Sequence, residues 1–186
     1  MRAVQALVLA MLALLSACSM RSALNSMTPE QDRAFAHEMV AHLRSGDEAW
    51  LRQRFRPDLW EESAKQLAGV PALFPAETGT TELVGFESRF NSAGGRTERE
   101  KNFNLVTHGG GRWTVTSFRT YSDGGPEKVV QWSVVPHASE PTELAVLNGM
   151  DAALPWIWGG AIAVLLLALG LIVWLVRRSG RKRRAA

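Results

Sequence analysis

The chain of 186 residues contains a single cysteine, Cys18, and a single tyrosine, Tyr121. One cysteine excludes an internal disulfide framework and a multi-cysteine zinc site. The chain also lacks the glycine patterns that cradle phosphates or dinucleotides, and the Gly-x-Ser-x-Gly turn that carries an esterase nucleophile. We therefore expect no cofactor and no metal site, and we expect that the protein is not an enzyme.

Two histidine segments and one tyrosine could suggest catalysis, but a structural interpretation is favoured for each. His37 and His42 are five residues apart, about 140° around a helix, so they cannot bind one metal ion as histidines four apart do. His108 precedes three glycines, which we interpret as a hairpin turn. Tyr121 and Asp123 flank another predicted turn, where we interpret them as a surface pair.

Acidic residues are absent from both ends of the chain. All 18 lie between Glu30 and Asp151, whereas six of the 21 basic residues follow Val176. Residues 3–176 carry a net charge of −4, so the formal charge of +3 comes from Arg2 and the tail. The tail, residues 177–186, contains Arg177, Arg178, Arg181, Lys182, Arg183 and Arg184. It has no interleaved aromatic residue, so we expect contact with anionic lipid, worth about 1 kcal/mol per cation, and no nucleic-acid partner.

The N-terminus has the pattern of an export signal, residues 1–17. Arg2 precedes an apolar run over Val4–Leu15, which is too short to span a bilayer. The run ends in Leu15-Ser16-Ala17-Cys18, which resembles the lipobox of bacterial lipoproteins. This resemblance implies cleavage before Cys18 and diacylation of its sulfur, with palmitate as a typical acyl chain. Cleavage just beyond, as in an ordinary signal peptide, and an uncleaved signal anchor are the alternatives.

A transmembrane helix is predicted over residues 156–176. These 21 residues carry no charge and, as a helix, measure roughly 31 Å, which matches the hydrocarbon core of a bilayer. Trp156 and Trp158 at one end and Trp174 at the other suit the two membrane interfaces. Because basic residues favour the cytoplasm, residues 177–186 are expected inside and the preceding domain outside, in the periplasm.

Gly159 and Ala163 form a small-xxx-small pair within this predicted span. Such pairs allow two helices to approach closely, so a homodimer through this pair is a further hypothesis.

Residues 28–136 are expected to form the exported domain, preceded by a polar tether over residues 18–27. Thr28 is predicted as the N-cap of a first helix, with Gln31 completing a capping box. Gly46 is expected to end this helix. Its apolar face contains Phe35, Ala36, Met39, Val40 and Leu43.

Two shorter helices are predicted to follow. Ser45-Gly46-Asp47-Glu48 has the form of a second capping box, starting a helix that continues to Arg54. Pro57 is expected to interrupt it, and Asp58–Leu67 predicts a third helix.

From Thr80 onward apolar residues alternate, and glycine-containing turns separate four such runs. This pattern predicts an antiparallel meander. The first run is expected to place Val84, Phe86 and Phe90 on one face. The fourth is expected to place together Val130, Trp132 and Val134.

The order of elements over residues 28–136, helices first and then strands, resembles that of the nuclear-transport-factor-like and cystatin-like roll. The resemblance also rests on the Gly46-Asp47 helix junction and on the Gly-Arg-Trp-Thr-Val segment at Gly111–Val115. It implies an α+β fold with N-terminal helices packed on a curled four-stranded antiparallel sheet. Residues 137–155 would link this domain to the span, either as a short helix closed by Gly149 or as a flexible stalk.

Together these features predict a membrane-anchored bacterial envelope lipoprotein at the outer face of the inner membrane. We expect a non-enzymatic binding, scaffolding or assembly role, with an envelope protein as partner. The alternative is a domain that binds a small ligand, or has isomerase-like activity, through a pocket in the concavity of the sheet.

Overall fold

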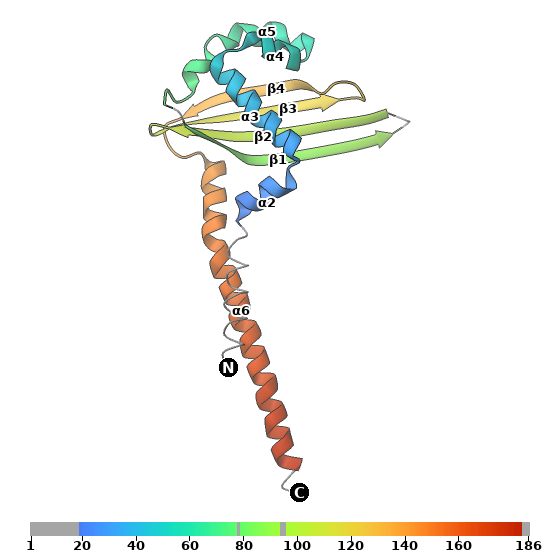
Figure 1. The fold of residues 1–186 in the computed structure, drawn as a ribbon, viewed down its shortest axis with the longest axis vertical. Helices are drawn as coiled ribbons and strands as arrows, with labels where there is room; N and C mark the ends of the chain where they lie inside the picture. Colours follow the sequence, from blue (N-terminus) through green and yellow to red (C-terminus); the bar gives the residue numbers. More distant parts are fainter. Residues whose placement is uncertain (1–18, 78, 94–95, 184–186) are drawn as a thin grey trace. The chain divides into compact units, whose positions relative to one another are not determined.

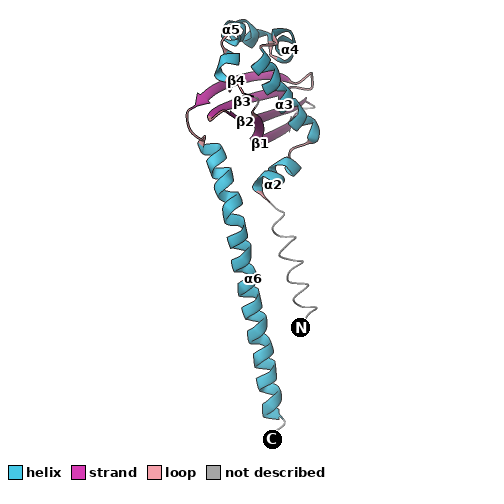
Figure 2. Cartoon of the chain, turned by 60° about the vertical axis from the view of Figure 1, so that its left-hand side comes forward, coloured by secondary structure: helices cyan, strands magenta, loops and turns pink. Residues whose placement is uncertain are grey.

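The computed structural model describes residues 19–77, 79–93 and 96–183, and its elements appear in Figures 1 and 2. The helices that precede the sheet are α2 (Met20–Met27), α3 (Glu30–Ser45), α4 (Glu48–Arg54), α5 (Pro57–Leu67) and the 3-10 helix η1 (Val70–Leu73). The strands are β1 (Thr80–Ala93), β2 (Arg96–Gly109), β3 (Arg112–Ser122) and β4 (Lys128–His137), and α6 (Thr142–Arg183) follows. The predicted α+β order is therefore confirmed. Met20–Leu147 form a compact domain, and α6 from Asn148 onward belongs to a separate unit.

The four strands form one antiparallel sheet in the order β1-β2-β3-β4, as the meander pattern predicts. The sheet is not curled, so the expectation of a roll with a concave face is wrong. Helices α3, α4 and α5 instead cover one face as a layer (Figures 1 and 2), which buries the apolar side chains of that face without closing the sheet around them.

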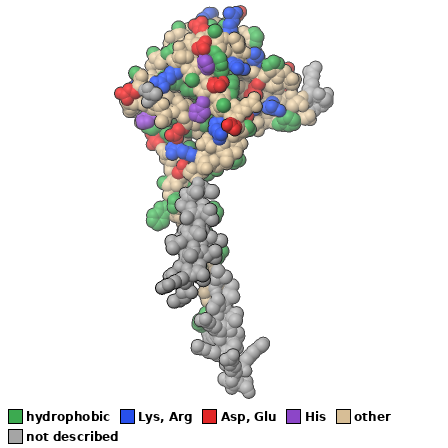
Figure 3. All heavy atoms as spheres, viewed as in Figure 1, with side chains coloured by type: hydrophobic (Ala, Val, Ile, Leu, Met, Phe, Trp, Pro, Cys, Tyr) green, Lys and Arg blue, Asp and Glu red, His purple; other side chains and the backbone are tan. Residues whose placement is uncertain are grey.

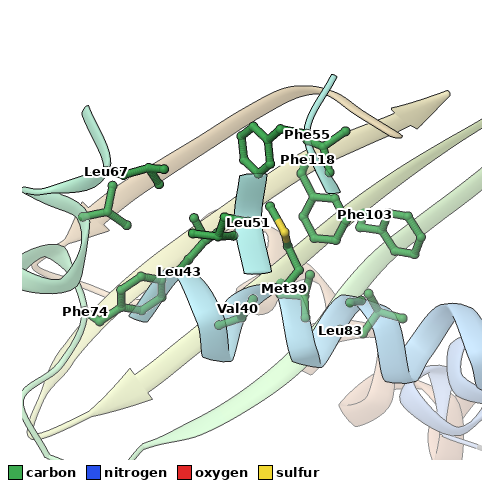
Figure 4. Packing of buried hydrophobic residues seen from close by; sticks show 14 residues of the cluster. Met39, Val40, Leu43, Leu51, Phe55, Leu67, Phe74, Leu83, Phe103 and Phe118 are labelled. Atoms are coloured by element: carbon green, nitrogen blue, oxygen red, sulfur yellow. The ribbon is translucent and has the colours of Figure 1, made fainter. Parts of the chain in front are cut away.

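The core lies between this helical layer and the sheet. Phe103 of β2 and Phe118 of β3 are register partners whose rings stack at 4.7 Å between centroids. Phe35 of α3 meets both rings edge-on, at 6.2 and 5.9 Å. The buried members shown in Figure 4 include Met39, Val40, Leu43, Leu51, Phe55, Leu67, Phe74, Leu83, Phe103 and Phe118. The apolar face predicted for the first helix is confirmed, because α3 buries its residues at three- and four-residue spacing.

The helix ends differ from the predicted capping boxes. The Thr28 hydroxyl donates to the Leu24 carbonyl at 2.8 Å, and α3 starts without a side-chain cap. Gly46 ends α3 in the left-handed conformation at φ 70°, as expected. Asp47, rather than Ser45, caps α4, because its carboxylate accepts the Trp50 N–H at 3.1 Å.

The predicted break between the second and third helices is confirmed, because α4 ends at Arg54, and α5 begins at Pro57, one residue before the predicted start at Asp58. The fixed φ of Pro57 suits a first helical turn, where the missing N–H has no intrahelical partner to lose.

Register shifts change which residues of the edge strands face the core. In β1 the pairing shifts between Leu83 and Gly85, so Leu83 and Phe86 pack under the helices while Val84 packs in a different cluster. Phe90, expected on the core face, is 63% exposed. The expected single face is therefore wrong for Val84, because one extra residue reverses the alternation there. Phe90 follows Phe86 by four residues and keeps the same face, but it remains exposed.

In β4 a similar shift lies opposite Arg119 and Thr120. Thr120 pairs with Val129 and Arg119 pairs with Gln131, which leaves Val130 as the extra residue. Val129, and not Val130, is consequently the buried partner of Trp132 and Val134 in the core.

A second, smaller cluster lies on the opposite face of the sheet, which we call the outer face. Its buried residues are Val106, Val115, Leu144 and Leu147, with Met20, Val84 and Trp113 packed against them. Residues 20–27, expected as a tether, thus form helix α2. In the expected linker, helix α6 begins at Thr142 and continues through Gly149 instead of closing there.

Candidate functional site

Helix α6 is long and apolar enough to cross a membrane. The described segment Thr142–Ala168 contains an 18-residue window with a mean hydropathy of 1.7, and no residue of that window is buried. Leu167 is 75% exposed and Trp156 is 83% exposed. Large apolar side chains left in water lose about 25 cal/mol per Å² of the free energy that burial would supply. Transfer of this segment to an apolar environment would therefore be favourable.

The three tryptophans predicted as anchors at the membrane interfaces all lie on α6. Trp156, Trp158 and Trp174 have exposed indole side chains. The helix also contains Arg177, Arg178, Arg181, Lys182 and Arg183 of the predicted basic cluster. Arg184 and the predicted lipidation site Cys18 lie outside the described residues.

Gly159 and Ala163 also lie on α6, one helical turn apart and exposed. A Cβ atom added to Gly159 would have nothing within 4 Å. The surface of this turn is therefore open to a second helix, and the dimer stays a prediction.

The two ends of the compact domain meet in the cluster on the outer face. Met20, two residues after Cys18, packs against a cluster that also contains Leu144 and Leu147. The Arg21 side chain adds a 3.0 Å ion pair to Glu82 of β1. The chain therefore enters and leaves the domain at one place, beside Val106 and Val115 of the central strands.

The outer face is polar beyond this cluster. Cross-strand pairing aligns one row of Asn102, Arg119 and Gln131 and a second row of Asn104, Ser117 and Ser133. These amide, hydroxyl and guanidinium groups surround a shallow hollow of about 110 Å³. Such a surface can offer hydrogen bonds to a partner.

A buried lysine forms the centre of a charged network in the domain. Lys101 of β2 is 7% exposed, and its ammonium group donates to Asp32 of α3 at 2.6 Å and to Glu127, before β4, at 2.8 Å. The Thr120 hydroxyl donates to the same Glu127 carboxylate. This network joins the first turn of α3 to the end of the β3–β4 hairpin.

Burial by itself lowers the pKa of Lys101, but the hydrogen bonds and charges of Asp32 and Glu127 outweigh it and raise the pKa above its ordinary value of 10.5. This site was not predicted from the sequence. One feature of the sequence does indicate it. Lys101 lies on the same face of the strand as Phe103 and Leu105, where an unpaired charge would be costly.

A cleft of about 280 Å³ opens beside this network, and we call it the Arg54–Arg99 cleft. It is lined by Gln31, Asp32, Phe35, Arg54, Arg99, Lys101, Pro126, Glu127 and Lys128. On the face shown in Figure 3, acidic and basic side chains are intermingled without one dominant sign.

Two of the histidines that were not expected to be catalytic, His42 and His108, pack against tryptophan rings. His42 stacks on Trp50 at 4.1 Å between ring centroids and contacts the Asp47 carboxylate at 3.0 Å. His108 stacks on Trp113 at 3.7 Å, next to the β2–β3 turn. Within residues 19–77, 79–93 and 96–183, no group of three or more His, Cys, Asp or Glu side chains is placed to hold a metal ion.

In comparisons with known proteins, no protein family, curated protein or solved structure matches the chain.

We predict that Lys101→Met lowers the free energy of unfolding by about 3 kcal/mol at pH 7, because two carboxylates then face each other without their cation. The folded pKa of Lys101 is raised, so its contribution is complete below pH 10.5 and is lost as the pH rises through the folded pKa. The difference between wild type and variant should therefore shrink above that pH. Urea unfolding of the full chain in detergent micelles measures both effects.

The matched control is Lys65→Met, since Lys65 is exposed on α5 and should change stability by less than about 0.5 kcal/mol. Equal losses for the two variants, or a difference independent of pH, would contradict the assigned role of Lys101.

Proposed function

We propose that this protein is a membrane-anchored envelope lipoprotein with a binding or scaffolding role at the outer face of the bacterial inner membrane. Helix α6 retains it there, and the domain Met20–Leu147 lies in the periplasm. A lipid on Cys18 attaches the other end of the domain to the same membrane.

The observation that carries this proposal is the apolar, exposed part of α6. A transmembrane helix anchors a protein essentially irreversibly, whereas one acyl chain binds only marginally. The cluster that joins Met20 to Leu144 and Leu147 supports attachment at both ends, because it brings the two connections to one place on the domain.

A binding role is favoured over a pocket in a curled sheet. The centre of the layer between the helices and the sheet is filled by the rings of Phe35, Phe103 and Phe118, so no ligand concavity lies there. The polar rows of the outer face, in contrast, present hydrogen-bonding groups to a partner.

The predicted topology can be tested with single cysteines and a membrane-impermeant maleimide added to spheroplasts. Ala186→Cys should remain unlabelled because it is cytoplasmic, and Ser139→Cys, an exposed position after β4, should be labelled. Adding Leu166→Arg and Leu167→Arg places two charges at the centre of the span, at a cost of about 6 kcal/mol. Ala186→Cys should then be exported and labelled.

The matched control for the arginine pair is Leu166→Ala with Leu167→Ala, which should keep Ala186→Cys unlabelled. Labelling of Ala186→Cys in the otherwise unchanged chain would refute the span, and so would recovery of the protein in the soluble or outer-membrane fraction.

Lipidation is tested separately by mass spectrometry of the mature N-terminus. We expect a chain that begins at an acylated Cys18, and Cys18→Ser should abolish the added lipid mass while α6 still retains the protein in the membrane. A mature chain that starts at Met1 or Met20 would disprove this assignment.

The partner surface can be probed with a photo-crosslinking amino acid in intact cells. We expect placement at Gln131, exposed on the outer face, to yield a discrete adduct with an envelope protein. Placement at Glu62, exposed on α5 among the helices that cover the other face, should not. Adducts of equal yield at both positions, or none at Gln131, would count against a partner on the outer face.

A further inference from the structure

The Arg54–Arg99 cleft collects charged side chains from separate parts of the fold. Arg54 comes from the last turn of α4, Arg99 and Lys101 come from β2, and Lys128 starts β4. Arg99 precedes Lys101 by two residues, so both belong to the face of β2 that the helices cover.

The charged groups at the inner wall of the cleft are paired with one another. Lys101 binds the carboxylates of Asp32 and Glu127 together, so these three groups leave a formal charge of −1. The rim adds three cations, and the lining as a whole carries a net charge of +2. A cleft with this excess attracts an anion.

The two arginines of the rim are available to bind such an anion. Lys128 donates to the Gln53 carbonyl at 2.5 Å. Within the described residues, neither Arg54 nor Arg99 has a carboxylate partner. The Arg54 guanidinium lies 5.1 Å from the centre of the Trp50 ring, and this cation–π contact favours that position of the side chain.

We propose that the Arg54–Arg99 cleft binds a small organic acid, with its carboxylate held between the two guanidinium groups. Planar guanidinium groups bind carboxylates through paired N–H donors. The half-buried ring of Phe35 and the ring of Pro126 line the same cleft and contact the carbon chain. The Asp32 and Glu127 carboxylates repel negative charge at the inner wall, so the carboxylate of the ligand is placed at the rim. A ligand that concentrates two negative charges on one small group, such as dianionic phosphate, is disfavoured relative to one whose carboxylates are separated by a carbon chain.

The volume of about 280 Å³ limits the ligand to a few carbon atoms or to the acidic end of a longer molecule. This inference goes beyond the proposed function and does not depend on it, since it uses only residues of the compact domain. Failure of the labelling experiment would leave it intact, and its own failure would leave the membrane topology intact.

The test follows the side-chain Nε–Hε signals of arginine by NMR in the full-length, ¹⁵N-arginine-labelled chain in detergent micelles. Sodium succinate is the probe, with inorganic phosphate and neutral succinamide titrated at the same ionic strength. We expect succinate to shift the signals of Arg54 and Arg99 in a saturable way. Arg54→Gln and Arg99→Gln should each weaken succinate binding at least about tenfold, because each removes charge-assisted hydrogen bonds.

Arg52→Gln is the matched control, because Arg52 is exposed on the same helix but does not line the cleft. It should leave succinate binding unchanged, and thermal unfolding of all three variants checks that they remain folded. No saturable shift at about 50 mM succinate, or equal weakening by Arg52→Gln, would overturn the site. Equal affinity for phosphate and succinate would overturn the assignment to organic acids, because it would indicate a simple anion site.

Discussion

The central strands must bury apolar side chains on both faces of the sheet at once. Leu105 is fully buried under the helices, and its neighbour Val106 is buried on the outer face. Because adjacent residues of a strand point to opposite faces, no single layer can cover both. The domain therefore needs α3 and its neighbours on one face and the start of α6, with Leu144 and Leu147, on the other.

This requirement gives α6 two roles along one helix. Its first turns complete the core of the domain, and its later turns present exposed apolar side chains that suit a bilayer. Burial of Leu144 and Leu147 means that the domain cannot lose this segment without exposing Val106 and Val115. The proposed anchor is thus part of the folded domain at its origin instead of an appended stalk.

The charged groups follow a second constraint. An ammonium group on the covered face of β2 is tolerated only because Asp32 and Glu127 approach it from two other elements. Meeting that need brings α3 and the β3–β4 hairpin together, and Arg54 and Arg99 lie around the opening that remains. A proposed binding cleft therefore arises where the fold compensates a buried charge.

Local patterns in the sequence determined the order of helices and strands, the apolar face of α3, the end of that helix at Gly46 and the apolar length of α6. Each depends on residues within a few turns or one strand, and so could be predicted. Only the tertiary structure decided that the sheet is not curled, that Val129 rather than Val130 is buried, and that Lys101 meets Asp32, which is 69 residues away. These outcomes depend on strand register and on contacts between distant segments, whose free energies no local pattern contains.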